Sequence, residues 1–385
     1  MTHTEAAQHI ADLIELTLIP GIGSLAQSRL RAACAETPQI FSLTPPELEA
    51  LRIPAEAWDA LRQRRYREMA QEILDWSLRH NCQLLPGGDP AYPAYLAQIY
   101  DPPLLLYMRG CREVLSQPCL AIVGTRRPTP YGLQMAEGMA YDLASRGMAV
   151  VSGLARGIDA AGHRGCLDAG GRTIAVLGCG IDVVYPREHR RLAHEIEEHG
   201  LLISEFSPGT SPAPQNFPVR NRIISGLAYG ALIVEASEYS GSLITARLAM
   251  EQNREVFALP GNITSPQSFG PNFLIKQGAK LVQSWRDIVE ELPPDLRNEI
   301  LAKEAAETCA APQLEMLNDD ELKVLSLLET DRATLFDRLH SMSGFEVSKT
   351  SNLLLGLEMQ GYVRQLPGSL FIRVVRPTKK KWLGI

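Results

Sequence analysis

The stretch CLAIVGTRRPTPYG, residues 119–132, decides the fold of this chain. Five apolar residues end at Gly124, and a loop with two arginines leads into the helical pattern of residues 132–146. An apolar run without polar alternation is typical of a strand that helices cover on both faces. The stretch therefore predicts a buried strand of a parallel sheet, followed by a tight turn and a helix.

The same alternation of apolar run and helical stretch continues to residue 282. The expected strands are Cys119–Val123, Ala149–Ser152, Thr173–Leu177, Leu201–Ser204, Ala231–Glu235, Glu255–Leu259 and Lys280–Val282. The expected helices between them are Gly132–Arg146, Ile158–Ala169, Glu188–His199, Ser242–Glu251 and Asn272–Gln277. Residues 82–110 are expected to be a connector with one short strand. This order predicts an α/β fold with an extended Rossmann-like, doubly wound sheet over residues 81–292.

Helical patterns precede this sheet. Two amphipathic stretches within residues 1–80 are separated by Pro20-Gly21-Ile22-Gly23, and Ser24 can cap the second stretch. This arrangement predicts a helical N-terminal domain that is SAM/helix-hairpin-helix-like. Either the amides of the turn hold a phosphate, or the two glycines only turn the chain.

A second small domain is expected after the sheet. Residues 293–317 contain Pro293-Pro294 and a tract of alanine and glutamate, which predicts a linker. Three helical patterns and a hairpin come next, at Asp319–Glu329, Ala333–Ser341, Val347–Gly361 and residues 363–375. Three helices followed by a two-stranded wing predict a C-terminal winged-helix domain over residues 318–377.

Composition limits the classes of function. The 385 residues carry a formal net charge of −6, with 45% hydrophobic and 21% charged residues. This balance excludes a chain that is basic throughout, so any anion site must be local. The seven cysteines lack metal-ligand spacing and no GxGxxG motif follows a strand, so neither a metal nor a cofactor is expected. Without a signal-like start or a long apolar segment, the chain is expected to be cytoplasmic and away from membranes.

Arginine and glycine residues gather where the expected strands end. Because the carboxyl ends of parallel strands meet at one edge of a sheet, their loops are expected to form a single site. Arginine donates two hydrogen bonds to a phosphate, and an aromatic ring stacks on an unpaired base. The residues expected in this polyanion site are Gly124, Thr125, Arg126, Arg127, Gly153, Arg156, Phe217, Arg220, Asn221, Arg222 and Ser242.

Simpler interpretations of these residues stay open. The loop arginines can be ordinary surface residues. Arg220 and Arg222 can instead be ion-paired with Glu205 or Glu235, with Phe217 in the core.

A catalytic interpretation has less support. Asp159 and His163 lie four residues apart and share a helix face, which would suit an acid–base pair. An aspartate in a first helical turn more often interacts with the helix dipole. We therefore expect a site that holds a polyanion and has no catalytic residues.

Longer motifs connect the chain with a known family. The matching text is DPAYPAYLAQIYDPPLLLYMRG, AIVGTRRPTPYG, VVSGLARGIDAAGHRGCLDAGGRTIAVLGCGIDVVYP, QNFPVRNRIISGLAYGALIVEASEYSGSLITARLAMEQNREVFALPGN and SFGPNFLIKQGAKLV, within residues 82–282. On these motifs the chain resembles the DNA-processing protein A (DprA) family. Members of that family bind single-stranded DNA and load RecA during natural transformation.

The resemblance implies a partner and a mode of action. It implies a homodimer that binds incoming single-stranded DNA in an arginine-lined pocket, protects it and loads RecA, without catalysis. The family's DNA contacts correspond here to Thr125, Arg126, Arg127, Arg156, Phe217, Arg220 and Arg222. The implied dimer interface lies at Phe273, Leu274 and Ile275. Pro214 departs from the family pattern, because some relatives have a basic residue there, and this puts one phosphate contact in question.

Two other functions remain as alternatives. Similar sheets occur in nucleotide-cleaving phosphoribohydrolases, whose PGGxGTxxE motif has its nearest counterpart at Tyr239–Thr245. The glutamate and the glycine pair of that motif are absent from this stretch. A duplex-binding regulator would instead use the helix at Val347–Gly361, in which Lys349 is the only lysine.

Overall fold

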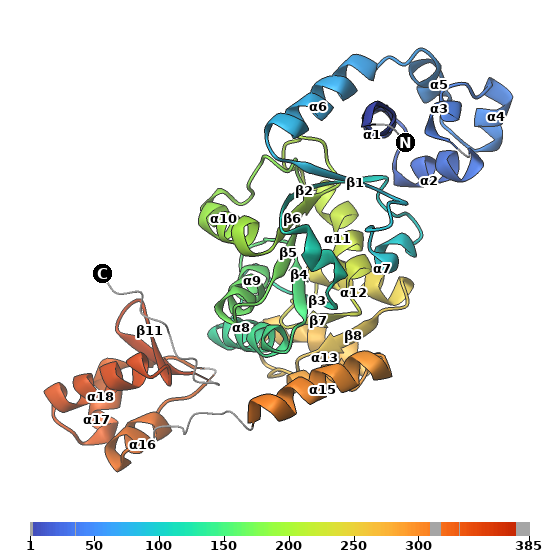
Figure 1. Ribbon diagram of the computed structural model, residues 1–385. Coiled ribbons are helices and arrows are strands. Elements are labelled where there is room, and N and C mark those ends of the chain that lie inside the picture. Colours follow the sequence, from blue (N-terminus) through green and yellow to red (C-terminus); the bar gives the residue numbers. More distant parts are fainter. Residues whose placement is uncertain (1–2, 35, 309–316, 331, 375–385) are drawn as a thin grey trace.

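The computed structural model describes residues 3–34, 36–308, 317–330 and 332–374 (Figure 1). A helical N-terminal domain lies beside one end of a central sheet, and a small C-terminal domain follows the helix labelled α15 (Figure 1). Within the described ranges, no helix is long and apolar enough to cross a bilayer.

The described residues of the N-terminal domain form six helices with a core of their own. They are α1 (His3–Leu18), α2 (Ser24–Ala33), α3 (Thr37–Ile40), α4 (Pro45–Ala50), α5 (Ala55–Arg62) and α6 (Arg67–Arg79). Leu16, Leu30 and Leu61 are fully buried in this core. The turn between α1 and α2 faces the central domain, because the Ser24 hydroxyl donates to Asp101 Oδ2 at 2.9 Å. This contact joins the start of α2 to the central domain, and the phosphate-binding interpretation of the turn stays a prediction.

Nine strands form the central sheet. They are β1 (Gln83–Pro86), β2 (Leu105–Gly110), β3 (Cys119–Val123), β4 (Ala149–Ser152), β5 (Thr173–Leu177), β6 (Leu201–Ser204), β7 (Gly230–Ile233), β8 (Glu255–Ala258) and β9 (Lys280–Leu281). Their order is β1-β2-β6-β5-β4-β3-β7-β8-β9, and all neighbours from β6 to β9 are parallel. The seven expected strands are present, whereas the connector contributes two antiparallel strands, β1 and β2, in place of one. Strand order reverses between β3 and β7, and ligands of doubly wound sheets bind at the carboxyl ends of such strands.

Helices cover both faces of the sheet. They are α7 (Ala94–Ala97), α8 (Pro130–Ser145), α9 (Ile158–Asp168), α10 (Arg190–His199), α11 (Asn216–Leu227), α12 (Ser242–Glu251), α13 (Phe269–Lys276), α14 (Trp285–Val289) and α15 (Pro294–Thr308), with single 3-10 turns at Arg112–Ser116, Arg187–His189 and Pro266–Ser268. One face packs against α11, α12 and α13, through side chains such as Ile224, Ala246 and Leu274. The other face packs against α8, α9 and α14, through side chains such as Leu143 and Ile158.

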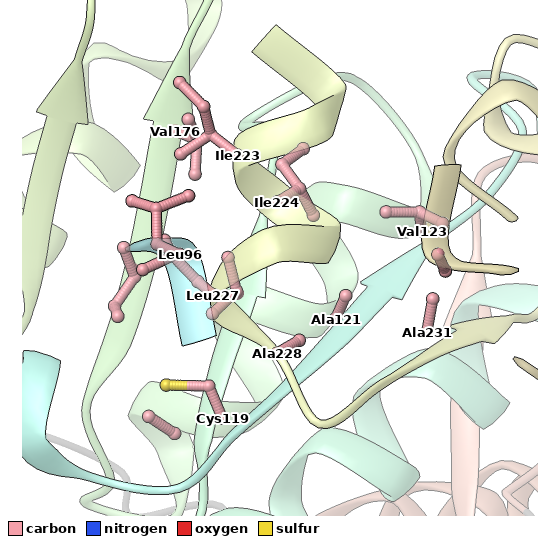
Figure 2. Close-up of a cluster of buried hydrophobic side chains, with 14 of the residues drawn as sticks. Leu96, Cys119, Ala121, Val123, Val176, Ile223, Ile224, Leu227, Ala228 and Ala231 are labelled. Carbon is pink, nitrogen blue, oxygen red and sulfur yellow. The ribbon is translucent and has the colours of Figure 1, made fainter. Parts of the chain in front are cut away.

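Helix α11 was not predicted from the sequence. It begins at Asn216 and has Pro218 in its first turn, where the missing amide hydrogen would have no partner within the helix. Its second half presents Ile223, Ile224 and Leu227 to the sheet, and all three are buried (Figure 2). This apolar contact holds the polar first half of α11 at the carboxyl ends of the strands.

The C-terminal region differs in part from the expected linker. Helix α15 occupies Pro294–Thr308, and its residues Leu296 and Ile300 pack with Trp285 against the central domain. Residues 309–316 of the expected linker lie outside the described residues, as do residues 375–377 of the expected winged helix.

A small winged helix follows. Its elements are α16 (Asp319–Ser326), β10 (Thr334–Leu335), α17 (Phe336–Ser343), α18 (Val347–Met359), β11 (Val363–Leu366) and β12 (Leu370–Arg373). The three strands form an antiparallel sheet in the order β10-β12-β11. Arg364 of this domain forms an ion pair with Glu137 of the central domain, with 2.8 Å between Arg364 Nη2 and Glu137 Oε2.

Candidate functional site

A cleft of about 750 Å³ lies at the carboxyl ends of β3 and β7. Three elements form its walls: the loop after β3, the first half of α11 and the N-terminus of α12. Residues that line it include Gly124, Thr125, Arg126, Arg127, Asp159, Tyr185, Pro214, Phe217, Arg220, Asn221, Ser240, Ser242, Thr245 and Gln267. The structure thus brings together eight of the eleven expected site residues.

The loop after β3 is held firmly at its base. The Thr125 amide donates to the Glu235 carbonyl at 2.7 Å, and the Arg127 amide donates to Thr125 Oγ1 at 3.2 Å. Gly157, with a φ of +77°, approaches so closely that a β-carbon there would lie 2.4 Å from the Thr125 carbonyl oxygen. The backbone is therefore fixed, while the side chains of Arg126 and Arg127 are exposed over the cleft.

Arg126 and Arg127 keep their charge available. Within the part of the chain that the structure describes, neither guanidinium forms an ion pair with a carboxylate. Two uncompensated cations on a fixed loop are suited to bind phosphate groups.

Glu235 stabilises this loop through hydrogen bonds with Thr129. Its carboxylate accepts hydrogen bonds from the Thr129 amide at 2.8 Å and the Thr129 hydroxyl at 2.5 Å. Thr129 is also the N-cap of α8, since its hydroxyl accepts from the Gly132 amide. Burial raises the pKa of Glu235, and the hydrogen bonds from Thr129 oppose that shift. The carboxylate is thus engaged in building the loop and does not line the cleft.

Arg220 lies on the floor of the cleft. It is 4% exposed, and its Nη1 donates to the Gly153 carbonyl at 2.8 Å and also to the Val176 carbonyl. Burial lowers the pKa of Arg220 to about 10, and the nearby carboxylate of Asp159 opposes that shift. The guanidinium therefore stays charged at neutral pH, which makes it a third cation of the cleft.

Phe217 provides an aromatic surface beside these cations. The Arg126 guanidinium carbon lies 5.4 Å from the centre of its ring, and that of Arg220 lies 6.0 Å away. Tyr185, which sequence analysis missed, lies next to it with 5.6 Å between ring centres. The only signal for Tyr185 was its position in the segment after β5, whose carboxyl end reaches the same edge of the sheet.

Arg222 differs from the expectation. Its Nη2 lies 2.5 Å from Glu205 Oε1 and its Nε lies 3.0 Å from Asp101 Oδ2. The side chain is 5% exposed and does not line the cleft. The simpler interpretation of this residue, an ion pair with Glu205, therefore describes its environment correctly.

Gly153 and Arg156 line a smaller pocket that adjoins the cleft and shares Arg126, Tyr185 and Phe217 with it. The Arg156 guanidinium is paired with Glu188, with distances of 2.5 Å and 2.6 Å for its two hydrogen bonds.

Three further residues line the cleft: Asn221, Ser242 and Pro214. The Asn221 side chain accepts from Arg220 Nε at 3.2 Å, and the Ser242 hydroxyl lies 2.8 Å from that of Ser240. Pro214 lines the cleft and brings no charge to it.

Asp159 and His163 do not act on each other. The Asp159 carboxylate accepts from the amide of Gly153 at 3.1 Å, while His163 Nδ1 lies 2.7 Å from Thr173 Oγ1. Burial lowers the pKa of His163 to about 3, so the ring is neutral. Among the described residues, no group of three or more His, Cys, Asp or Glu residues could hold a metal ion.

The expected dimer interface is only partly exposed. Phe273 is 48% exposed and stacks with Phe269, at 6.1 Å between ring centres. Leu274 is 6% exposed and Ile275 packs against the core of the central domain. Of the three residues, Phe273 presents the largest surface to solvent.

Comparisons with known proteins agree with this architecture. The sequence profile of the family described as DNA recombination-mediator protein A matches residues 83–293, and that of the DprA winged helix domain matches residues 308–369. The DNA processing protein DprA of Bacillus subtilis is 47% identical over 210 residues, which cover 54% of this chain and 71% of that protein. Protein Smf of Escherichia coli is 39% identical over 317 residues, which cover 80% of this chain and 82% of that protein.

A solved structure is also similar. The X-ray structure of DNA processing protein A from Streptococcus pneumoniae superposes with a TM-score of 0.64 at 35% sequence identity. The match covers 72% of this chain and 96% of that one.

Proposed function

Since the chain belongs to the family of DNA recombination-mediator protein A, we propose that it binds single-stranded DNA in the cleft at the carboxyl ends of β3 and β7. One observation carries this proposal: Arg126 and Arg220 lie beside the ring of Phe217, and Arg127 lines the same cleft. Guanidinium groups supply affinity for the phosphates, and the ring supplies a surface for an unpaired base.

The cleft favours an unpaired strand over a duplex. Bases can reach Phe217 and Tyr185 only when they are unstacked from a partner strand, whereas a duplex presents phosphates on its outside. The winged helix offers a weaker duplex site. Its α18 exposes Val347, Leu355 and Met359, and Lys349 is paired with Asp320 at 2.7 Å. A duplex-binding regulator is therefore the less supported alternative.

Binding without catalysis is the second part of the proposal. The comparisons name no catalytic activity. The phosphoribohydrolase alternative needs an available carboxylate in the cleft. Glu235 does not line the cleft and accepts hydrogen bonds from Thr129, and Asp159 lines it but accepts from backbone amides. The stretch nearest to the phosphoribohydrolase motif does reach the cleft, through Thr245, but it brings no glutamate there. We infer that the bound strand is held, shielded and released unchanged.

The wider role follows the family resemblance. We propose that the chain acts as a homodimer in the cytoplasm, protects strands taken up in natural transformation and loads RecA on them. The exposed rings of Phe269 and Phe273 support a contact between two copies of the central domain. Formation of RecA filaments on strands preincubated with the protein would measure the loading step.

A direct binding experiment tests the proposal. Fluorescence anisotropy would compare a labelled single-stranded oligonucleotide with its duplex, for wild type and for Arg126→Ala/Arg127→Ala. A matched control is Arg190→Ala/Arg191→Ala, an exposed arginine pair that does not line the cleft. We expect the cleft variant to lose most single-strand affinity and the control to keep it. Equal affinities for the two variants would refute the proposed site.

A further inference from the structure

We propose that Tyr185 is a base-stacking residue and that it forms with Phe217 a two-ring platform for an unpaired nucleobase. The proposal rests on the proposed function, and it assigns to Tyr185 a role that the arginines cannot supply. Tyr185 lines both the cleft and the smaller pocket beside it, so its ring lies on the boundary between the two.

The spacing of the two rings decides how a base can bind. Their centres are 5.6 Å apart and their planes are inclined by 32°. A base inserted between two parallel rings needs roughly 7 Å, because each stacking contact takes about 3.5 Å. The rings are therefore too close to enclose a base, and they form a continuous surface on which a base rests.

Phe217 cannot provide this surface alone. Its ring packs against the backbone of Gly178 so closely that a β-carbon there would lie 2.7 Å from the ring. The guanidinium groups of Arg126 and Arg220 lie near it as well. These contacts hold Phe217 in place and cover part of it, so the residue is partly buried.

Tyr185 has the complementary properties. Its side chain is 41% exposed, although Pro186 beside it is buried and Val184 packs against the core. The backbone is thus anchored while the ring projects into solvent at the site. A large ring exposed in this way contributes little to the stability of the fold. It is available to a ligand with a flat apolar face.

A base-specific experiment tests the platform. Affinities of wild type, Tyr185→Leu and Tyr185→Phe would be measured for a single strand and for the same strand with abasic sites. We expect Tyr185→Leu to weaken binding of the normal strand by about 5- to 100-fold, as for loss of one stacked base, and Tyr185→Phe to bind as wild type. For the abasic strand, wild type and Tyr185→Leu should bind alike. Tyr239→Leu is the control, because Tyr239 is 91% exposed and does not line the cleft.

A second measurement detects stacking directly, without relying on affinity. Binding of a strand that contains 2-aminopurine to the wild-type protein should quench the fluorescence of the stacked base, and binding to Tyr185→Leu should quench it less. Unchanged affinity and unchanged quenching in Tyr185→Leu would overturn the platform. If Arg126→Ala/Arg127→Ala still weakens binding in that case, the proposed DNA site stands without Tyr185. If neither substitution has an effect, the proposed function fails as well.

Discussion

Arg220 and Arg222 lie two residues apart on α11, and their guanidinium groups occupy different environments. Arg220 lines the cleft and donates to backbone carbonyls, whereas Arg222 is paired with the carboxylates of Glu205 and Asp101. Two residues correspond to roughly 200° of rotation around a helix, so the side chains point in nearly opposite directions. The two arginines therefore have separate environments: Arg220 faces the cleft and Arg222 ties α11 to Glu205 and Asp101.

The first prediction concerns stability. Arg222→Met should lower the free energy of unfolding by about 3 kcal/mol or more, because it leaves the buried Glu205 carboxylate without its partner. Urea denaturation at pH 8 would measure the change. A loss below about 1 kcal/mol would mean that the pair contributes little to the fold.

The second prediction concerns pH. Burial raises the pKa of Glu205, and the charge of Arg222 opposes that shift. Arg222→Met should therefore raise the pKa of Glu205 in the folded protein further. A carboxyl whose pKa is higher in the folded state destabilises the protein when it is ionised, and protonation relieves the effect. The difference in the free energy of unfolding between wild type and Arg222→Met should therefore shrink as the pH falls from 8 to 5. Adding Glu205→Gln should restore part of the stability at pH 8, and no recovery in this double variant would contradict the explanation.

The third prediction concerns salt. The affinity for single strands should fall with salt concentration at a log–log slope of about −0.7 for each phosphate that is neutralised. Arg126→Ala/Arg127→Ala should reduce the magnitude of that slope by about 1.4 if each arginine contacts one phosphate. The slope of Arg190→Ala/Arg191→Ala should equal that of wild type. A cleft variant with an unaltered slope would show that these arginines do not contact phosphates.

The fourth prediction concerns the ion pair between Arg156 and Glu188. Glu188→Gln should release Arg156 and remove a negative charge near the smaller pocket, so single-strand affinity should rise a few-fold at low salt. Glu195→Gln, which frees the exposed Arg191 on α10, is the matched control. If Glu188→Gln and wild type bind single strands with equal affinity, Arg156 does not contact the DNA.

The fifth prediction concerns self-association. Phe273→Asp should yield a monomer in sedimentation experiments without a change in unfolding, because Phe273 is 48% exposed. Leu274→Asp should instead lower stability, because Leu274 is 6% exposed and an unpaired charge would be buried. Dimers of unchanged affinity in Phe273→Asp would place the interface elsewhere.

Much of the fold could be predicted because its signals are local. Buried parallel strands are continuous apolar runs, and β3, β4, β5 and β6 begin and end at the residues that those runs predict. Helix α11 escaped prediction because Pro218 and Gly226 interrupt its pattern, and its helical state depends on packing of Ile223, Ile224 and Leu227 against the sheet. The first half of the expected linker is likewise a helix, because Leu296 and Ile300 find a surface on the central domain.

The candidate site divides in the same way. By itself the sequence determined that arginines, glycines and Phe217 follow the strand ends, and a parallel sheet must bring those ends to one edge. Only the tertiary structure decided which guanidinium groups are free: Arg126 and Arg127 face the cleft, while Arg222 meets Glu205, a residue 17 positions away. It also placed Tyr185 beside Phe217. The physical reason is that a charge or a ring is made available by its neighbours in space, and the rotation of a helix or the path of a loop sets those neighbours.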